Sequence, residues 1–174
     1  MESADETHFV LRGEKIRWEE IPGPVTAIPE FKPYESGPAA EIEVVRKVRE
    51  RKFAATVRWA YHEKCSLCEI GFRLRGRPLA LDAAHIIPAE ERGTSLDVRN
   101  GLLLCKNHHA LFDQYAWVPD EDYRVLVSPE REFRSTAMAN HLLKLEGRRL
   151  PNLPSNPANL PAIEAIQYRL DKFR

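Results

Sequence analysis

The sequence contains only three cysteines, carries no net charge and lacks any long apolar run. No stretch approaches the roughly 18 apolar residues that a membrane-spanning helix needs. Three cysteines cannot all pair with one another, and the spacing of Cys65 and Cys68 suits a metal better than a structural disulfide. The start of the chain is acidic, where a secretory signal is basic and then apolar. We therefore expect a soluble, cytoplasmic protein that is not attached to a membrane.

The balance of 26 basic against 26 acidic residues hides a segregation of charge along the chain. Residues 1–45 hold four basic and ten acidic side chains, net −6, whereas residues 46–81 hold ten and three, net +7. Residues 82–134 return to −4, with six and ten, and residues 135–174 come to +3, with six and three. A basic stretch thus precedes the motif-rich centre, so a nucleic-acid partner is compatible with zero net charge.

The pattern of breakers and apolar residues predicts an α+β protein with one compact core. Five of the thirteen prolines fall in the first forty residues, which predicts an extended or looped arm over 1–45. Helical spacing of apolar residues predicts a helix over 41–62. Strands are expected over 79–87 and 101–105 and a helix over 106–114, which together form a ββα unit. A strand over 123–127 and helices over 135–146 and 163–173 complete the prediction, with 46–134 as the core and 135–174 packing on it.

Three cysteines and one histidine have the spacing of a zinc site. Cys65 and Cys68 form one pair, and Cys105 and His108 form a second. Thiolate and imidazole ligands in two such pairs are typical of tetrahedral, structural zinc, which stabilises small irregular units. The alternative is that the cysteines are ordinary buried thiols and His108 is a surface residue.

A second group of polar residues comprises His85, Asn100, His109 and Asp113. His109 and Asp113 are four residues apart, so they share a helix face and can hold one cation together. His108 lies about 100° around the same helix, so the two adjacent histidines can serve different metals. Taken alone, His85 would also be compatible with a core histidine at a strand end.

These residues carry a family resemblance. The segments Ala84-His-Ile-Ile-Pro88, Asn100-Gly-Leu-Leu-Leu-Cys105 and His108-His-Ala-Leu-Phe-Asp113 resemble the HNH motif of the ββα-metal nucleases, in the branch found in bacterial restriction endonucleases. The similarity covers roughly residues 46–174 and is most specific over 65–113. The first forty-five residues resemble no family that we can name.

The resemblance implies a role for each motif residue. His85 would be the general base that takes a proton from the attacking water. Asn100 would orient it by holding the backbone nearby. His109 and Asp113 would bind a catalytic Mg²⁺ or Mn²⁺, which stabilises charge on the phosphate and the departing oxygen.

The sequence departs from the family pattern immediately before the base. Many HNH enzymes have Asp or His at this position, where this chain has Ala84. Asp82 lies two residues earlier on the same strand face, about 6.5 Å back along the chain, and is a candidate replacement ligand. A surface carboxylate at the strand edge is the alternative.

The basic segment predicts a phosphate-binding surface for double-stranded DNA. Its candidate contacts are arginines of the first helix and of the loop before the strand, namely Arg46, Arg49, Arg58, Arg73, Arg75 and Arg77. Such contacts position a duplex without reading bases, and a solvated helix face is the alternative.

The expected function is a metal-dependent HNH DNA endonuclease of restriction or defence type. Cutting both strands with one active site per chain would favour a homodimer. The competing hypotheses are a non-catalytic, zinc-stabilised DNA-binding module, for which Ala84 is the argument, and an RNA nuclease or homing-type nickase.

Overall fold

The computed structural model describes residues 8–11, 14–17, 43–88, 91, 96–130, 132, 134 and 136–173. Much of the predicted N-terminal arm lies outside these residues. Within the arm, however, β1 (His8–Leu11) and β2 (Glu14–Arg17) form an antiparallel hairpin. The strands of this hairpin are extended backbone, as the prediction of an extended or looped arm allows.

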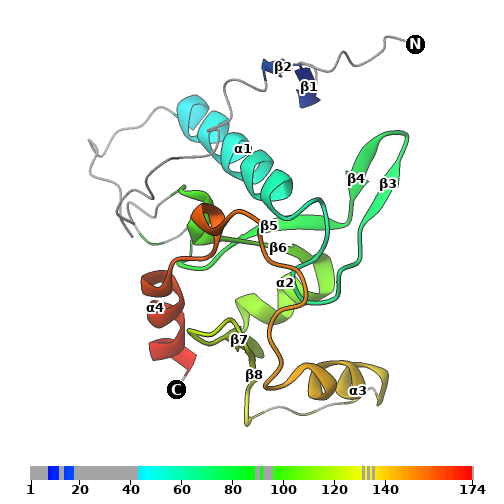
Figure 1. The fold of residues 1–174 in the computed structure, drawn as a ribbon, viewed down its shortest axis with the longest axis vertical. Coiled ribbons are helices and arrows are strands. Elements are labelled where there is room, and N and C mark those ends of the chain that lie inside the picture. Colours follow the sequence, from blue (N-terminus) through cyan, green and yellow to red (C-terminus); the bar gives the residue numbers. More distant parts are fainter. Residues whose placement is uncertain are drawn as a thin grey trace.

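The central unit is a β-hairpin lying between two helices (Figure 1). Helix α1 (Glu43–Ala60) covers one face, and α2 (Lys106–Asp113) follows directly from the second strand on the other. The strands are β5 (Leu81–His85) and β6 (Gly101–Cys105), paired antiparallel with His85 opposite Gly101. The α+β class and the ββα core are confirmed.

Helix α1 packs on the hairpin through Phe53 and Val57, two of the residues whose spacing predicted it. Gly101 makes this approach close, because a Cβ at that position would lie 2.6 Å from Val57 Cγ2 and 3.0 Å from Phe53 Cζ. The hydroxyl of buried Tyr61 donates to the Gly101 carbonyl at 3.1 Å, which fastens the end of the helix to the start of β6. Glycine is therefore required here for space.

Two further hairpins extend the fold, and the sequence did not predict the first of them. β3 (Phe72–Leu74) and β4 (Arg77–Leu79) project from the core as an exposed ribbon (Figure 1). A loop was expected here, but both strands of this ribbon are edges, where a proline such as Pro78 is tolerated. β7 (Trp117–Pro119) pairs with β8 (Val125–Val127), so the predicted strand over 123–127 is shorter than expected.

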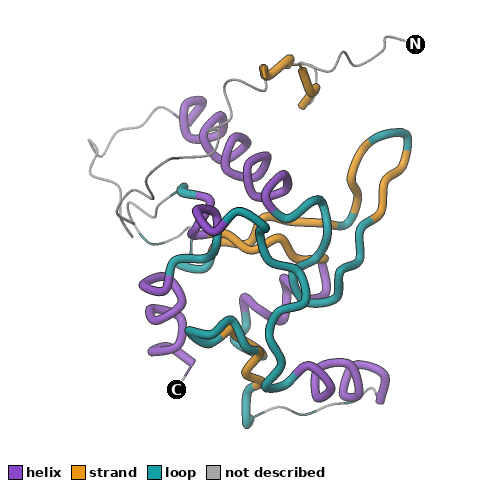
Figure 2. Tube along the Cα trace, viewed as in Figure 1, coloured by secondary structure: helices purple, strands orange, loops and turns teal. Residues whose placement is uncertain are grey.

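The C-terminal part returns across the core, as the trace in Figure 2 shows. Helix α3 (Thr136–Leu145) is followed by an irregular segment with a 3-10 turn, η3 (Pro157–Asn159), and then by α4 (Ile163–Phe173). Ile166 and Leu170 of α4 are buried against Val118 of β7. None of the helices in the described part of the chain is both long enough and apolar enough to cross a membrane.

Candidate functional site

The four predicted zinc ligands converge. One ligand atom from each of Cys65, Cys68, Cys105 and His108 lies within 4.8 Å of the others. His108 Nδ1 is 3.5 Å from Cys65 Sγ and 3.2 Å from Cys105 Sγ. These separations fit neighbouring ligands of one tetrahedral ion with bonds of about 2.1–2.3 Å. The cluster is therefore confirmed, and its donors suit zinc.

Hydrogen bonds inside the cluster favour thiolate formation. The thiol of Cys68 donates to Cys65, which lowers the pKa of the Cys65 thiol to about 3 although burial acts in the opposite direction. The same hydrogen bond raises the pKa of Cys68. A cluster that already stabilises one thiolate is a favourable receptor for a divalent cation, because zinc binds the deprotonated form.

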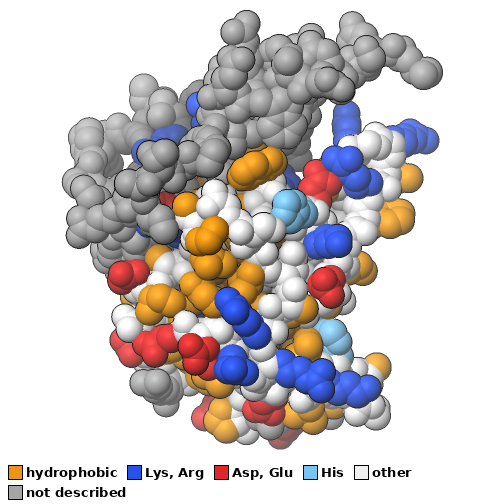
Figure 3. Space-filling model, in the orientation of Figure 1, with side chains coloured by type: hydrophobic (Ala, Val, Ile, Leu, Met, Phe, Trp, Pro, Cys, Tyr) orange, Lys and Arg blue, Asp and Glu red, His pale blue; other side chains and the backbone are white. Residues whose placement is uncertain are grey.

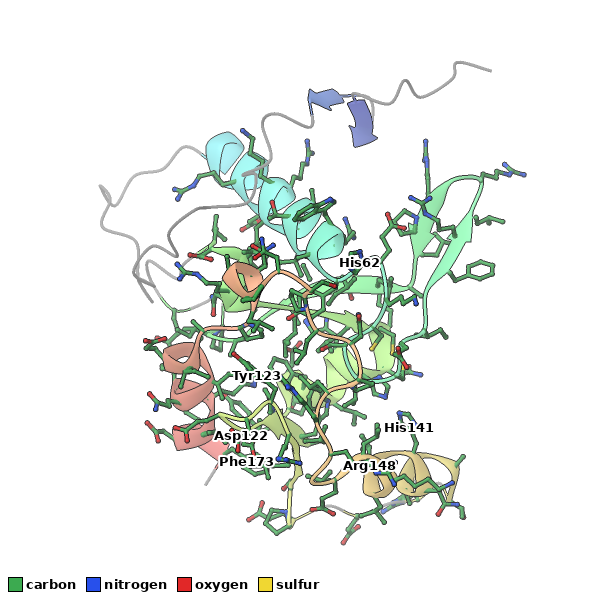
Figure 4. All side chains as sticks on the ribbon, in the orientation of Figure 1. His62, Asp122, Tyr123, His141, Arg148 and Phe173 are labelled. Atoms are coloured by element: carbon green, nitrogen blue, oxygen red, sulfur yellow. The ribbon has the colours of Figure 1, made fainter. Side chains whose placement is uncertain are left out.

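A second histidine supports the ligand His108 from behind. His141 projects from α3 toward α2, and its Nε2 lies 3.0 Å from Nε2 of His108 (Figure 4). The two rings are stacked with their centres 5.0 Å apart. With Nδ1 directed at the cysteines, Nε2 of His108 is left to donate to His141, which fixes the tautomer and orientation of the ligand. No local sequence pattern predicts this contact, because the two histidines are 33 residues apart.

The loop carrying Cys65 and Cys68 is fastened by the C-terminal segment. Asn152 donates through its side-chain amide to the carbonyls of Tyr61 and Lys64, at 3.1 and 2.8 Å. Ser66, fully buried, donates to the Asn152 carbonyl at 2.8 Å. The loop needs such support because His62 and Glu63 both have positive φ, of 52° and 54°, which is unfavourable for side chains with a Cβ.

His109 stands between the two predicted carboxylate ligands. Its Nε2 is 3.4 Å from Asp113, one turn further along α2, and its Nδ1 is 3.2 Å from Asp82 on β5. The two carboxylates thus lie at opposite nitrogens of one ring. His109 and Asp113 fit a common cation at the Nε2 edge, whereas Asp82 is placed to accept the Nδ1 proton.

Asp82 also forms an ion pair with Lys106, whose Nζ lies 2.7 Å away. Burial acts to raise the pKa of Asp82, but hydrogen bonds from Lys106 and His109 outweigh it and hold the pKa below its usual value. Asp82 thus has two partners on α2, and both the ligand and the surface-carboxylate interpretations stay predictions. As a direct ligand it would have to turn away from both of them.

His85 and Asn100 lie at the end of the same hairpin where the connecting segment joins β5 to β6. The His85 ring is stacked on Phe53 of α1, with ring centres 4.2 Å apart. Asn100 is fully buried in η2 (Val98–Asn100), and its side chain accepts from the Ile87 amide at 2.9 Å and donates to the Ile87 carbonyl at 3.4 Å. The Asn100 carbonyl accepts from the Ile86 amide at 2.9 Å. Asn100 therefore holds the two residues that follow His85.

The predicted DNA contacts differ in accessibility. Arg49 and Arg58 of α1 are half-buried, whereas Arg75 and Arg77 are exposed on the β3–β4 ribbon. Arg73 is engaged by Glu63, with Nε and Oε2 2.6 Å apart. The side chain of Arg46 lies outside the described residues. Figure 3 shows basic side chains at the tip of the projecting ribbon with apolar ones along its edge.

The apolar edge of the ribbon is unusual for an exposed hairpin. Phe72, Leu74 and Leu79 are 57%, 54% and 41% exposed, and Ile70 beside them is 56% exposed. Ile70, Phe72 and Leu79, with residues at the start of α2, line a depression of about 190 Å³. The ribbon leads within two residues into β5, so it is continuous with the strand that carries Asp82 and His85.

Comparison with known proteins finds a family model that matches the region of the site. Residues 65–118 match the family model described as HNH endonuclease. Among solved structures, a "Modification dependent TagI restriction endonuclease" is similar at 22% identity and a TM-score of 0.51, covering 70% of this chain and 37% of that one. This likeness shows a shared fold, and the chain spans little more than a third of that protein. No curated protein matches the sequence.

Proposed function

We propose that this chain, whose residues 65–118 form an HNH endonuclease domain, is a divalent-metal-dependent DNA endonuclease of restriction or defence type. One observation carries the proposal. The His109 imidazole has the Asp113 carboxylate at its Nε2, on the helix that directly follows the strands bearing His85 and Asn100. This is the order of parts that phosphodiester hydrolysis requires: a base, a group that holds it and a cation-binding pair.

His85 is the proposed general base. A ring nitrogen takes a proton from water as the water attacks phosphorus, which suits an imidazole whose pKa lies near neutrality. Phe53 supports one face of the ring. Asn100 holds the backbone at Ile86 and Ile87, so the strand end cannot rotate the imidazole away from the substrate.

His109 and Asp113 are the proposed ligands of the catalytic ion, Mg²⁺ or Mn²⁺. When bound, such an ion supplies positive charge to the phosphate and to the departing 3′ oxygen. Asp82 accepts the Nδ1 proton of His109 and thereby directs Nε2 toward the cation. The Cys65, Cys68, Cys105 and His108 cluster holds a structural Zn²⁺ in this proposal.

The substrate surface is proposed on the basic side of the fold. Arg75 and Arg77 contact duplex phosphates from the ribbon, with Arg49 and Arg58 of α1 as weaker contributors. A homodimer, a cytoplasmic location and the division into 1–45, 46–134 and 135–174 stay predictions.

The decisive experiment is incubation with supercoiled plasmids, methylated and unmethylated, with Mg²⁺, Mn²⁺ or EDTA. We expect nicked or linear products that disappear with EDTA. His85→Ala should keep zinc content and DNA affinity but cleave at least about 10²-fold more slowly, the scale of general-base catalysis. Cleavage by His85→Ala at the wild-type rate would exclude His85 as the base. A parallel RNA substrate separates DNA from RNA nuclease activity.

A non-catalytic, zinc-stabilised DNA-binding module remains the second candidate. Two observations favour it: Ala84 supplies no ligand, and Lys106 occupies one oxygen of Asp82. It predicts salt-sensitive DNA binding by the wild type and no cleavage with either ion.

A further inference from the structure

A buried arginine from the C-terminal helix bridges two parts of the proposed catalytic site. Arg169 of α4 is 1% exposed. Its Nη1 donates to the Ile86 carbonyl at 3.1 Å, and its Nη2 donates to the Phe112 carbonyl. Ile86 directly follows His85, and Phe112 directly precedes Asp113. One guanidinium therefore touches the strand end next to the base and the helix end next to a proposed metal ligand.

Aromatic rings flank this guanidinium, and the Asp113 carboxylate acts on it electrostatically without forming an ion pair. The guanidinium Cζ lies 3.5 Å from the ring centre of Phe112 and 4.4 Å from that of Tyr115. No carboxylate in the described part of the chain forms an ion pair with it, and burial lowers the pKa of Arg169 to about 10. A buried cation without a carboxylate is unfavourable, so stability alone is a poor explanation for its presence.

The two hydrogen bonds explain why the residue is an arginine. The Phe112 carbonyl is in the last turn of α2, where the helix dipole favours a cation. The Ile86 carbonyl belongs to a different element, and only the planar fork of a guanidinium presents donors on separate nitrogens to both. A lysine has a single nitrogen and cannot span the two carbonyls in the same geometry.

We propose that Arg169 is a positioning residue that fixes the separation between His85 and the His109/Asp113 pair. This inference rests on the proposed function, because it assigns His85 and Asp113 their roles. The residue lies 51 positions beyond the end of the segment that matches the family model, at residue 118. Helix α4 is then a part of the catalytic site. Lys172 on the same helix reinforces it by binding Glu91, in the connection between β5 and β6, at 3.0 Å.

The test compares Arg169→Lys and Arg169→Gln with Arg148→Lys, a matched change at an exposed arginine. Single-turnover cleavage is measured at saturating DNA and Mn²⁺, at a temperature well below each variant's melting point. We expect both Arg169 variants to keep zinc content and DNA affinity while the cleavage rate falls about 10–10²-fold, the effect of a misplacement near 1 Å. Arg148→Lys should cleave like the wild type. An unchanged rate at lowered melting temperature would make Arg169 a structural residue only and overturn the proposal.

Amide hydrogen exchange supplies a readout that needs no activity. Arg169→Lys should speed exchange at both 86–87 and 112–115 while leaving the zinc cluster and the β3–β4 ribbon protected as in the wild type. Faster exchange confined to α4, or at only one of the two segments, would contradict the bridge. If the wild type itself does not cleave, the proposed function fails, and the exchange pattern still decides whether Arg169 couples the two segments.

Discussion

Asp82 and Ala84 lie on the face of β5 that points toward α2, because side chains alternate along a strand. His85 lies on the other face, against Phe53. At the position where many HNH enzymes have a ligand, this chain therefore presents a methyl group to α2. Asp82 compensates for the missing ligand indirectly, because its carboxylate contacts Nδ1 of His109, a proposed metal ligand. The same carboxylate contacts the Lys106 ammonium. We expect it to act on the catalytic ion through His109.

Asp82→Asn should weaken the binding of the catalytic ion without abolishing it. Loss of a carboxylate behind a histidine ligand lowers metal affinity by about 10–100-fold. The Mn²⁺ concentration for half-maximal cleavage should rise by that factor, and the rate at saturating Mn²⁺ should stay near that of the wild type. Asp113→Asn is the matched comparison, and its rate should stay low at saturation. Equal Mn²⁺ dependence of Asp82→Asn and wild type would make Asp82 irrelevant to metal binding.

Gly101→Ala should destabilise the fold. The added Cβ would meet Val57 Cγ2 at 2.6 Å, and both that side chain and Phe53 are buried. Overpacking of this kind costs about 1–3 kcal/mol, measurable by urea denaturation. In Gly101→Ala/Val57→Ala the clashing methyl group is gone, so the double variant should be less destabilised than the sum of the single changes. If the losses of stability in the two single variants simply add, the strand moves to accommodate the new Cβ, and the side chains of the helix do not.

At the scale of elements, α2 is the part that both proposed metal sites share. Its first turn carries His108, whose Nδ1 meets the cysteines, and the next residue, His109, turns to the carboxylates. The helix has only eight residues, too few to be stable alone in water. Its position therefore depends on the groups at its two ends, namely the zinc cluster and Arg169.

Cys68→Ser should lower both zinc content and thermal stability. Binding energy at such a site is largely folding energy, so an incomplete ligand set leaves the 65–68 loop and the start of α2 unconnected. Metal analysis and thermal denaturation of the purified variant check this. Full zinc occupancy with an unchanged melting temperature would mean that the cysteines are merely buried.

His141→Ala should weaken the zinc site more mildly. The change removes the acceptor behind His108 but no ligand, and such partners contribute about 10–100-fold in metal affinity. Competition with a chromogenic chelator measures the affinity. His62→Ala is the control, since His62 is exposed and its imidazole contacts Ser155 instead of the cluster. An affinity equal to that of the wild type would show that the His141 contact does not orient His108.

At the scale of the whole molecule, the charge counted along the sequence does not show which arginines of the proposed DNA-binding surface are exposed. The sequence assigned the basic stretch to α1 and the following loop alike. In the structure the α1 arginines with described side chains, Arg49 and Arg58, are half-buried, whereas the loop is a ribbon that exposes Arg75 and Arg77. Charge counts cannot show this difference, because exposure depends on packing.

Arg75→Ala/Arg77→Ala should therefore flatten the salt dependence of DNA binding. Each lost phosphate contact lowers the log–log slope by about 0.9 and weakens all sequences alike. Arg49→Ala/Arg58→Ala, which makes the same charge change, should have the smaller effect. DNA affinity is measured by fluorescence anisotropy at several salt concentrations. All variants also carry His85→Ala, so that the DNA is not cleaved during the measurement. If only the α1 pair changes the slope, the duplex lies along the helix instead of the ribbon.

The sequence predicted the parts of the fold that local patterns specify. Both short apolar strands, helix α2 and the four zinc ligands follow from spacing, because ligand pairs and strand-helix order are local properties. His141, Asn152 and Arg169 were missed since each acts on residues 33 or more positions away. The β3–β4 ribbon was missed for a different reason: apolar and basic residues alternate over 72–75 before Gly76, but the segment was interpreted as a loop.

The segment that matches the HNH family model, residues 65–118, depends on Arg169, Asn152 and Phe53, which lie outside it. This dependence limits the use of the segment as a transferable module. A fragment cut to 65–118 would lose the guanidinium that joins Ile86 to Phe112, the amide that fastens the cysteine loop and the ring behind His85. Grafted onto a foreign DNA-binding protein, it would carry every motif residue and lack the supports that arrange them. The smallest unit that keeps these supports therefore extends from α1 through α4, and fusion partners belong before residue 43 or after residue 173.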